Sequence, residues 1–230
     1  MARALFGLFS FGICLMLPFE TLLGRVAADP AVQPALERFL SRSNEKVGSY
    51  RARRVLEGQN PRFNLRATLE AVTEFSNGRF SYTVVSESGS DQIRQKVLRP
   101  LLEAEATVLE TGDQTRSALT NDNYEIAAGE LAEPGVVKLF AKPRRKDVAL
   151  IDGAVFVTSD DADLLRVEGR MAKNPSFWTT RVNVIRRYDR VAGIRVPVRL
   201  DSTAQIRFAG ESSLSMVYQY EMVNGVEVTH

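Results

Sequence analysis

Cysteine and histidine, the two residue types that carry most nucleophilic and metal chemistry, each occur once in this chain of 230 residues. Cys14 lies in an apolar N-terminal run, and His230 is the last residue. Catalytic triads, thiolate zinc sites, iron–sulfur clusters and disulfide frameworks need these residue types in the folded core. We therefore expect no catalytic residues of this kind, no metal and no cofactor, and a binding protein rather than an enzyme.

The N-terminal segment has the pattern of a secretory signal peptide. Arg3 precedes an apolar run of 16 residues from Ala4 to Phe19, and Val26-Ala27-Ala28 offers small residues before a cleavage point. The run is shorter than the roughly 20 residues with which a helix spans a bilayer, and an uncleaved anchor is the alternative. We expect a signal peptide over 1–28, a single mature domain over 29–230, and export to the periplasm.

The charge balance limits the partners of the mature chain. Removing the leader takes away Arg3, Glu20 and Arg25 and leaves 28 basic and 27 acidic residues. A nucleic-acid binder needs an excess of cations to neutralise phosphates, so we expect no nucleic-acid partner. Local basic clusters such as Arg144-Arg145-Lys146 have two interpretations: solvated turns paired with acids, or transient contact with a membrane surface.

Hydrophobic periodicity predicts a helix and then strands at the start of the mature chain. Apolar residues recur at spacings of three and four from Val32 to Leu40, which indicates a helix over 30–43 with Asp29 as its N-cap. Asn77-Gly78 is a strong hairpin signal, because both residues tolerate positive φ. The strands expected here cover 49–56, 65–71 and 80–84.

After residue 89 the spacing of apolar residues changes from that of a strand to that of a helix, and after residue 123 it returns to that of strands. Apolar residues from Ile93 to Ala104 mark an amphipathic helix over 90–110, with Ser90 as N-cap and a kink at Pro100, and a short helix is expected over 114–119. The remaining strands are expected at 124–131, 135–142, 147–151, 154–158, 163–171, 178–190, 194–208 and 212–223. Tight turns are expected at Asp152-Gly153, Ala192-Gly193 and Ala209-Gly210.

The segment from Ile194 to Phe208 indicates the fold class. Its apolar residues alternate with charged and polar ones, as in an antiparallel sheet with one face against an apolar interior and the other in water. Pro197 lacks a backbone donor and predicts a local bulge or a sheet edge. We therefore predict an α+β fold in a single domain: a curved antiparallel sheet with the helices packed on its concave apolar face.

The apolar face of the last strands is the candidate binding surface. Flexible methionines and large aromatic rings suit a wall against apolar ligands such as an acyl chain, whereas the alternative is an ordinary packed core. The candidate cavity-lining residues are Val182, Val184, Val196, Val198, Leu200, Ile206, Leu214, Met216, Tyr218 and Tyr220. Phe177 and Trp178 are predicted to form a cavity rim or a partner-docking knob, or else a turn pinned by aromatic packing.

An acidic tip at Asp160, Asp161 and Asp163 separates two of the predicted strands. It lacks the glycine and the distal glutamate of a calcium-binding loop, so we expect a polar hairpin turn and not a metal site. The acids of the chain leave a third hypothesis open, a hydrolase whose two buried carboxylates exchange protons.

Several segments resemble the central hairpins of a bacterial envelope family, the periplasmic lipoprotein-sorting carriers (LolA, LolB and RseB-like proteins). The segments are 136–145 (VVKLFAKPRR), 148–153 (VALIDG), 154–158 (AVFVT) and 164–169 (LLRVEG). The block from Gly169 to Trp178 is similar to uncharacterised periplasmic proteins. The resemblance implies an unclosed half β-barrel around a helical lid, a carrier or sensor that shelters acyl chains, and no catalytic residues.

These observations together predict a periplasmic, non-enzymatic carrier or sensor that binds lipid or lipoprotein acyl chains in a half-barrel cavity. The alternative is an envelope protein-interaction or regulatory module of the same fold with no lipid cargo. In that case an envelope partner docks on a surface strand or on Phe177 and Trp178.

Overall fold

The computed structural model describes residues 30–42 and 47–229. The predicted signal peptide, its cleavage point and the predicted N-cap Asp29 lie outside these residues. Within them, eleven strands form one antiparallel sheet. The strands are β1 (Ser49–Asn60), β2 (Leu65–Ser76), β3 (Arg79–Gly89), β4 (Tyr124–Glu133), β5 (Val136–Pro143), β6 (Ile151–Thr158), β7 (Leu164–Met171), β8 (Thr179–Val191), β9 (Ile194–Ile206), β10 (Gly210–Val223) and β11 (Val226–Glu227).

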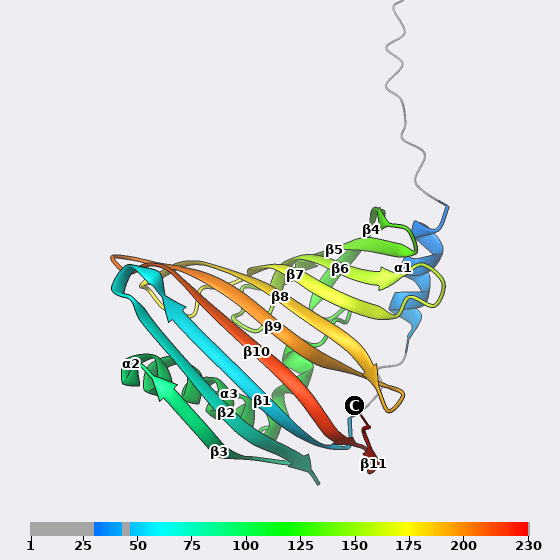
Figure 1. Cartoon of the computed structure of the whole chain (residues 1–230). Coiled ribbons are helices and arrows are strands. Elements are labelled where there is room, and N and C mark those ends of the chain that lie inside the picture. The colour runs from blue at the N-terminus through cyan, green and yellow to red at the C-terminus, as the bar shows by residue number, and fades with distance from the viewer. Residues whose placement is uncertain (1–29, 43–46, 230) are drawn as a thin grey trace, which may run out of the picture.

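The sheet is long, curved and unclosed (Figure 1). The order is β3-β2-β1-β10-β9-β8-β7-β6-β5-β4, with β11 paired to β10. From β4 to β10 each strand pairs with the next along the chain, as the series of predicted hairpins requires. The first three strands join through β1, which pairs with β10 from Tyr50↔Val223 to Gln59↔Ser213. In the described residues β3 and β4 are the two outer strands, and they do not pair with each other.

Two helical segments cover the sheet, one near each of its outer strands (Figure 1). The first is α1 (Val32–Ser41). The second runs through α2 (Asp91–Ile93), a π-helical turn η2 (Arg94–Leu98) and α3 (Arg99–Glu110). Two short 3-10 turns, η1 (Pro61–Phe63) and η3 (Asp113–Ser117), lie elsewhere in the chain. Ser90 caps α2, because its Oγ accepts a hydrogen bond from the backbone N–H of Ile93 at 3.5 Å. The sequence predicted a kink at Pro100. The structure has a π-helical turn directly before it, over Arg94–Leu98, and Pro100 lies in the first turn of α3, where a proline is tolerated.

Both helical segments pack on the same face of the sheet. The buried cluster under α1 combines Val32, Ala35, Leu36, Tyr124, Val137, Leu139, Ala141, Leu150, Ile151, Val155, Val157, Ala162, Val167, Val182 and Val184. The cluster under α2 and α3 combines Leu56, Ala67, Leu69, Ala71, Ile93, Leu98, Leu102 and Met216. Leu200 of β9 packs against both clusters, so they form the two halves of one apolar layer.

The structure corrects one turn, one strand and one strand end expected from the sequence. A strand was expected over 147–151, but residues 147–150 precede β6 and form no strand. Asp152 and Gly153 lie inside β6 instead of forming a turn between two strands. Gly153 pairs with Gly169 of β7, and a Cβ at Gly153 would lie 2.1 Å from the carbonyl oxygen of Glu168, so this glycine permits close strand contact. Phe208 lies in the turn between β9 and β10 and not on the inward face of a strand.

Candidate ligand-binding site

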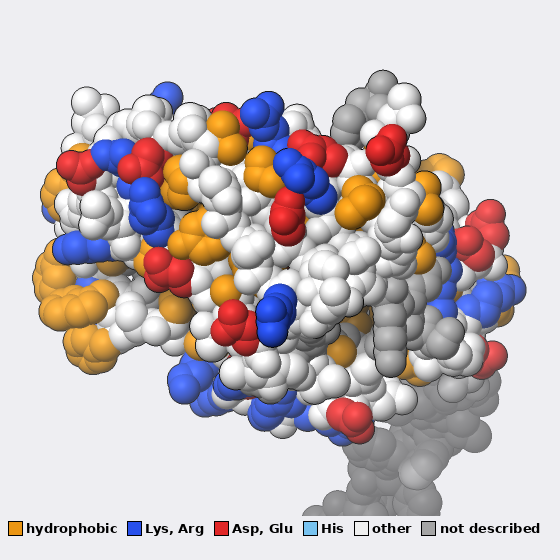
Figure 2. All heavy atoms as spheres, turned by 90° about the horizontal axis from the view of Figure 1, so that it is seen from below, with side chains coloured by type: hydrophobic (Ala, Val, Ile, Leu, Met, Phe, Trp, Pro, Cys, Tyr) orange, Lys and Arg blue, Asp and Glu red, His pale blue; other side chains and the backbone are white. Residues whose placement is uncertain are grey.

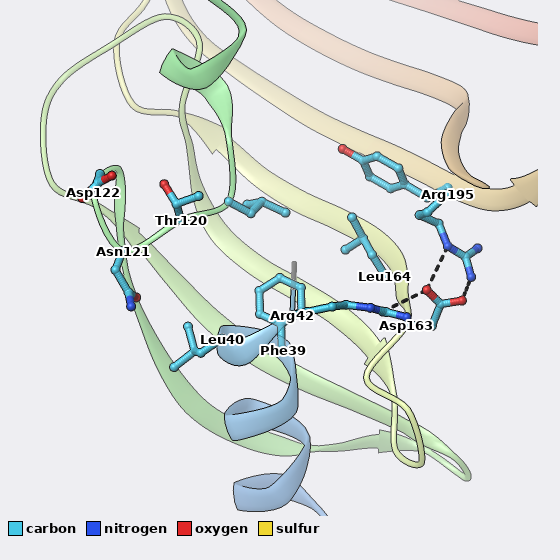
Figure 3. A pocket seen from close by; sticks show the side chains of 11 residues that line it. Phe39, Leu40, Arg42, Thr120, Asn121, Asp122, Asp163, Leu164 and Arg195 are labelled. Carbon is cyan, nitrogen blue, oxygen red and sulfur yellow. Dashed lines mark hydrogen bonds and ion pairs between the residues drawn. The ribbon is translucent and has the colours of Figure 1, made fainter. Parts of the chain in front are cut away.

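A cavity of about 410 Å³ opens beside the C-terminal half of α1 (Figure 3). Its volume falls in the range of about 300–1,000 Å³ that small-molecule sites occupy. It is bounded by α1, by the turn at 119–122 and by the ends of β7, β8 and β9 that meet there. Its lining residues are Phe39, Leu40, Arg42, Leu119, Thr120, Asn121, Asp122, Asp163, Leu164, Tyr188 and Arg195.

The cavity wall has an apolar part, a charged end, and a polar edge formed by Thr120, Asn121 and Asp122 of the 119–122 turn. The apolar part consists of side chains from α1, the 119–122 turn, β7 and β8, namely Phe39, Leu40, Leu119, Leu164 and Tyr188. The charged end carries Arg42, Asp163 and Arg195, which meet at one side of the opening in Figure 3. Such a wall fits a ligand with an apolar chain and a polar group, because each part finds a surface of its own kind.

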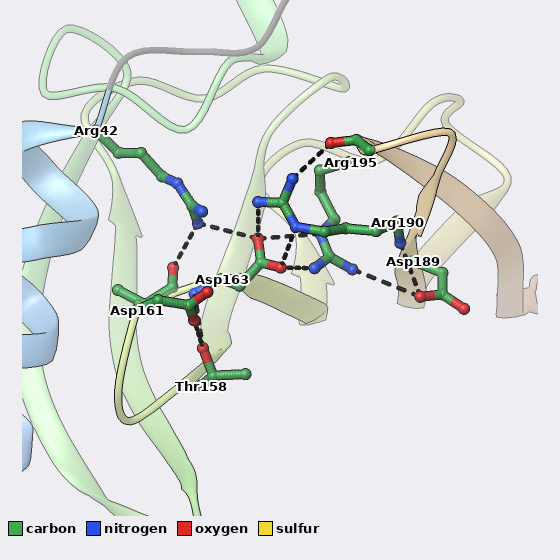
Figure 4. Close-up of polar contacts among 9 residues, drawn as sticks. Arg42, Thr158, Asp161, Asp163, Asp189, Arg190 and Arg195 are labelled. Carbon is green, nitrogen blue, oxygen red and sulfur yellow. Dashed lines mark hydrogen bonds and ion pairs between the residues drawn. The ribbon is translucent and has the colours of Figure 1, made fainter. Parts of the chain in front are cut away.

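Asp163 is the centre of the charged end (Figure 4). Its side chain is 6% exposed and contacts three guanidinium groups. Arg42 Nη1 lies 3.0 Å from Oδ1, Arg190 Nε lies 2.8 Å from Oδ2, and Arg195 Nε lies 3.1 Å from Oδ1. These arginines come from the end of α1, from β8 and from β9, so one buried carboxylate ties three elements together. We call Arg42, Asp163, Arg190 and Arg195 the arginine clamp.

The turn between β6 and β7 positions the arginine clamp. Thr158 Oγ1 accepts a hydrogen bond from the backbone N–H of Asp163 at 2.8 Å and contacts the carboxylate of Asp161. The hydroxyl of Thr158 lowers the pKa of Asp161. Ala162 adopts φ +55°, and its carbonyl accepts a hydrogen bond from Arg42 Nη1 at 3.0 Å. The predicted acidic tip is therefore a hairpin turn whose third acid points inward.

A second polar group lies under α3 and contains Arg54, which is 1% exposed. Arg54 Nη2 donates to Glu105 Oε1 at 2.8 Å and to the hydroxyl of Tyr50 at 2.7 Å, and Nη1 also binds Glu105. The guanidinium lies 4.6 Å from the ring centre of Tyr218 and 5.5 Å from that of Phe80. Burial opposes the charge of Arg54, but the hydrogen bond and charge of Glu105 outweigh it and raise its pKa.

The tyrosines around Arg54 stay neutral at physiological pH. Burial raises the pKa of Tyr50, and the nearby Glu105 carboxylate raises it further. Burial also raises the pKa of Tyr218 and of Tyr220. These hydroxyls therefore act as hydrogen-bond donors and acceptors and not as bases.

The ten residues predicted to line a cavity are distributed over the packed face. Val182, Val184 and Leu200 belong to or pack against the cluster under α1. Leu214, Met216 and Tyr218 belong to or pack against the cluster under α2 and α3. Val196, Val198 and Tyr220 belong to or pack against a third cluster with Ala52 and Val223. Ile206 is partly buried at the end of β9.

The cavity beside α1 is lined by none of these ten among the described residues. Leu214 lines a second cavity of about 620 Å³ that crosses β1, β2, β8, β9 and β10, and most of its lining residues are of polar types. Sequence reasoning missed Arg42 and Arg195 and read Asp163 only as part of a turn. No local signal connects Arg42 with Asp163, because 121 residues separate them.

Buried carboxylates bear on the hydrolase hypothesis. Among the described residues the buried acids are Asp147 and Asp163. Asp163 belongs to the arginine clamp. Asp147 binds Arg116 Nε at 2.6 Å, and the hydrogen bond from Arg116 is the main cause that lowers its pKa. The two acids therefore lie in separate arginine-rich surroundings and not as a pair.

No family model and no curated protein matches this sequence. Among solved structures, a DUF1329 family protein from Desulfovibrio piger superposes with a TM-score of 0.41 and 11% sequence identity. The superposition covers 82% of this chain and 90% of that chain. A TM-score below 0.5 does not transfer a function, so the candidate site rests on this chain's own residues. The resemblance to lipoprotein-sorting carriers stays a prediction.

Proposed function

We propose that this protein is a non-enzymatic carrier or sensor that binds lipid or lipoprotein acyl chains, and that the cavity beside α1 is the binding site. One observation carries the proposal, namely the cavity of about 410 Å³ with an apolar wall and a charged end. The acyl chain lies along Phe39, Leu119 and Leu164, and the polar group of the ligand faces Arg42 and Arg195. The affinity comes mainly from apolar burial, at about 0.8 kcal/mol per methylene group.

The test is titration of the mature protein with a fluorescent fatty acid, together with native mass spectrometry of the purified protein. We expect saturable binding and a co-purified lipid. Leu164→Trp fills the cavity and weakens binding by about tenfold or more, since it excludes several methylene groups. The matched control is Leu131→Trp on β4, which is 41% exposed and does not line the cavity. The proposal is contradicted if the wild type carries no lipid and does not bind the fluorescent fatty acid. It is also contradicted if the two variants bind the fatty acid with equal affinity.

The proposal includes a periplasmic location, which rests on the signal-peptide pattern of residues 1–28. N-terminal sequencing of the protein from a periplasmic extract should read Asp29 first. A protein that keeps Met1 and sediments with membranes would support the uncleaved anchor instead.

A protein-interaction module without lipid cargo is the second candidate function. It is favoured by the tight packing of the predicted binding face, where Val196, Met216 and Tyr220 are each less than 5% exposed. A lipid-free protein in native mass spectrometry, with no fatty-acid titration, would support this candidate.

A further inference from the structure

Four aromatic side chains project into solvent from three turns at one end of the sheet. Phe63 is 53% exposed, Phe177 73%, Trp178 56% and Phe208 79%. The ring centres of Phe177 and Trp178 lie 5.5 Å apart, and those of Trp178 and Phe208 lie 6.3 Å apart. We call these four residues the aromatic tip. Contiguous exposed apolar surface of this kind marks an interaction site rather than ordinary surface.

The aromatic tip is a fixed surface, because hydrogen bonds join its turns. Asn60 Nδ2, at the start of the turn that carries Phe63, donates to the carbonyl of Ala209 at 3.0 Å and to Ser212 Oγ at 2.7 Å. The backbone N–H of Arg207 donates to the carbonyl of Trp178 at 2.8 Å. The three turns therefore present their rings together.

Phe208 is unfavourable for the stability of the fold in two respects, its backbone conformation and the exposure of its ring. It adopts φ +65°, a left-handed conformation that is unfavourable for a side chain with a Cβ and that glycine adopts freely. Its ring remains 79% exposed and so gains little from burial. We infer from this unfavourable backbone and side chain that Phe208 serves a contact outside the chain.

The charge of the three turns differs from that of the whole chain. The segments 60–66, 172–181 and 205–211 contain five basic residues and one acid, whereas the chain has 30 basic and 28 acidic residues. The basic residues are Arg62, Arg66, Lys173, Arg181 and Arg207, and the acid is Glu211. Glu211 accepts a hydrogen bond from Gln205 at 2.7 Å, and the guanidinium of Arg207 lies 4.5 Å from the ring centre of Phe177.

We propose that the aromatic tip docks on the surface of a lipid bilayer that contains anionic lipids. Tryptophan and phenylalanine favour the headgroup region, and arginines beside them are attracted to anionic headgroups. In Figure 2, hydrophobic side chains gather at the left end of the face, with Lys and Arg beside them. In Figure 1, the β1–β2 and β9–β10 turns lie at the same left end of the molecule. In the described residues no helix is long and apolar enough to cross a membrane.

The docking surface is separate from the proposed ligand site and goes beyond it. β9 begins beside Arg195 at the cavity and ends at Ile206 beside the aromatic tip, so the two sites lie at opposite ends of one strand. Failure of one proposal therefore leaves the other intact. Leu164→Trp should lose fatty-acid binding and keep vesicle binding.

Trp178 is the only tryptophan of the chain, so it reports directly on the aromatic tip. We expect the mature protein to co-sediment with vesicles of phosphatidylethanolamine and phosphatidylglycerol and to bind vesicles of phosphatidylcholine less tightly. The emission of Trp178 should shift to the blue on binding, and brominated acyl chains should quench it. Added salt should weaken the binding, because it screens the arginines.

Phe208→Gly separates docking from folding. Glycine relieves the positive φ, so the melting temperature should stay unchanged or rise, while vesicle affinity falls by about tenfold or more. Phe177→Ser should also weaken vesicle binding. Its matched control is Phe140→Ser on β5, where a phenylalanine that is 48% exposed lies outside the tip. The proposal is overturned if the wild type does not bind vesicles, which is the result expected for a tip that docks on a protein. It is also overturned if Phe208→Gly binds vesicles as tightly as the wild type.

Discussion

The two helical segments pack on one face of the sheet but are held there by opposite charge arrangements. At the end of α1, one buried anion, Asp163, meets three cations that include Arg42. Under α3, one buried cation, Arg54, meets one anion, Glu105, and aromatic rings. Both helical segments therefore bury apolar side chains against the sheet, but a buried anion anchors α1 and a buried cation anchors α3.

This difference explains where space remains open. The rings of Tyr50, Phe80 and Tyr218 surround the guanidinium of Arg54, so the half under α3 is closed around its charge. In the arginine clamp, Arg42 is 31% exposed and Arg190 34%, and the cavity opens beside Arg42. A buried ion pair adds little net stability over apolar packing, but removing one partner alone is strongly destabilising. We therefore expect each of these ion-pair groups to hold its own helix in place.

The largest expected effect follows from removing the anion under α3. Glu105→Gln leaves the guanidinium of Arg54 buried without a counter-charge and should lower the free energy of unfolding by about 3 kcal/mol. Arg54→Met should cost less, because Glu105 is 31% exposed and can be hydrated. Urea denaturation measures both. The control Glu103→Gln, on an exposed position of α3, should have little effect. A larger loss in Arg54→Met than in Glu105→Gln would contradict this account.

A smaller effect is expected at the arginine clamp. Asp163→Asn removes the carboxylate that three partly exposed arginines share, and we expect a loss of about 2 kcal/mol. Hydrogen exchange should speed up in the last turn of α1 and remain unchanged in α3. Asp160→Asn in the same turn is the control, since Asp160 is exposed. Equal changes in both helices would show that the two anchors do not act locally.

A third prediction concerns the close packing of β1 against the side chains of α2 and η2. A Cβ at Gly58 of β1 would lie 2.7 Å from Ile93 Cγ2 and 3.3 Å from Leu98 Cδ2. Gly58→Ala should therefore destabilise the protein by about 1 kcal/mol through overpacking. Combining it with Ile93→Ala should cost less than the sum of the two single variants, because the clash is removed. Strict additivity in thermal unfolding would argue against this contact.

The last effect, similar in size to that of Gly58→Ala but dependent on pH, concerns the connection between the halves, where Asp147 binds Arg116 of η3 and Arg145. The folded-state pKa of Asp147 is lowered, chiefly by the hydrogen bond from Arg116. Its contribution, about 1 kcal/mol, is therefore present above the unfolded pKa of about 3.9 and is lost as pH falls through the lower folded pKa. Stability of wild type and Asp147→Asn should converge in acid. Asp152→Asn, on an exposed position of β6, should give no such convergence.

Local patterns in the sequence predicted most elements, because periodicity and turn chemistry depend on neighbouring residues. The alternation in Leu65–Ala71 predicted β2, and Ala192-Gly193, with φ +49° and +79°, forms the predicted turn between β8 and β9. The pairing of β8 with β9 shifts register beside Pro197, as the missing donor predicted. The prediction was wrong for Gly153, since a glycine inside a strand and a glycine in a turn have the same local pattern.

The candidate sites could be predicted only in part. Phe177 and Trp178 were predicted to form a cavity rim or a partner-docking knob, or else a turn pinned by aromatic packing. Phe63 and Phe208 were not singled out as exposed, because their exposure depends on how three turns meet. The alternation that includes Phe208 indicated an inward face, and the turn placed it outside. The cavity beside α1 involves side chains from five separate segments, and no spacing in the chain connects them.

The sequence by itself determined the positions of the helices and most strands, the absence of cysteine and histidine from residues 29–229, and the near-neutral charge. These are properties of composition and of neighbouring residues. Tertiary structure alone decided that β1 pairs with β10, that Asp163 binds Arg42, and that Phe208 joins Trp178 at one tip. Such contacts join residues far apart in the chain, and they form only when the whole sheet curves and brings its strands together.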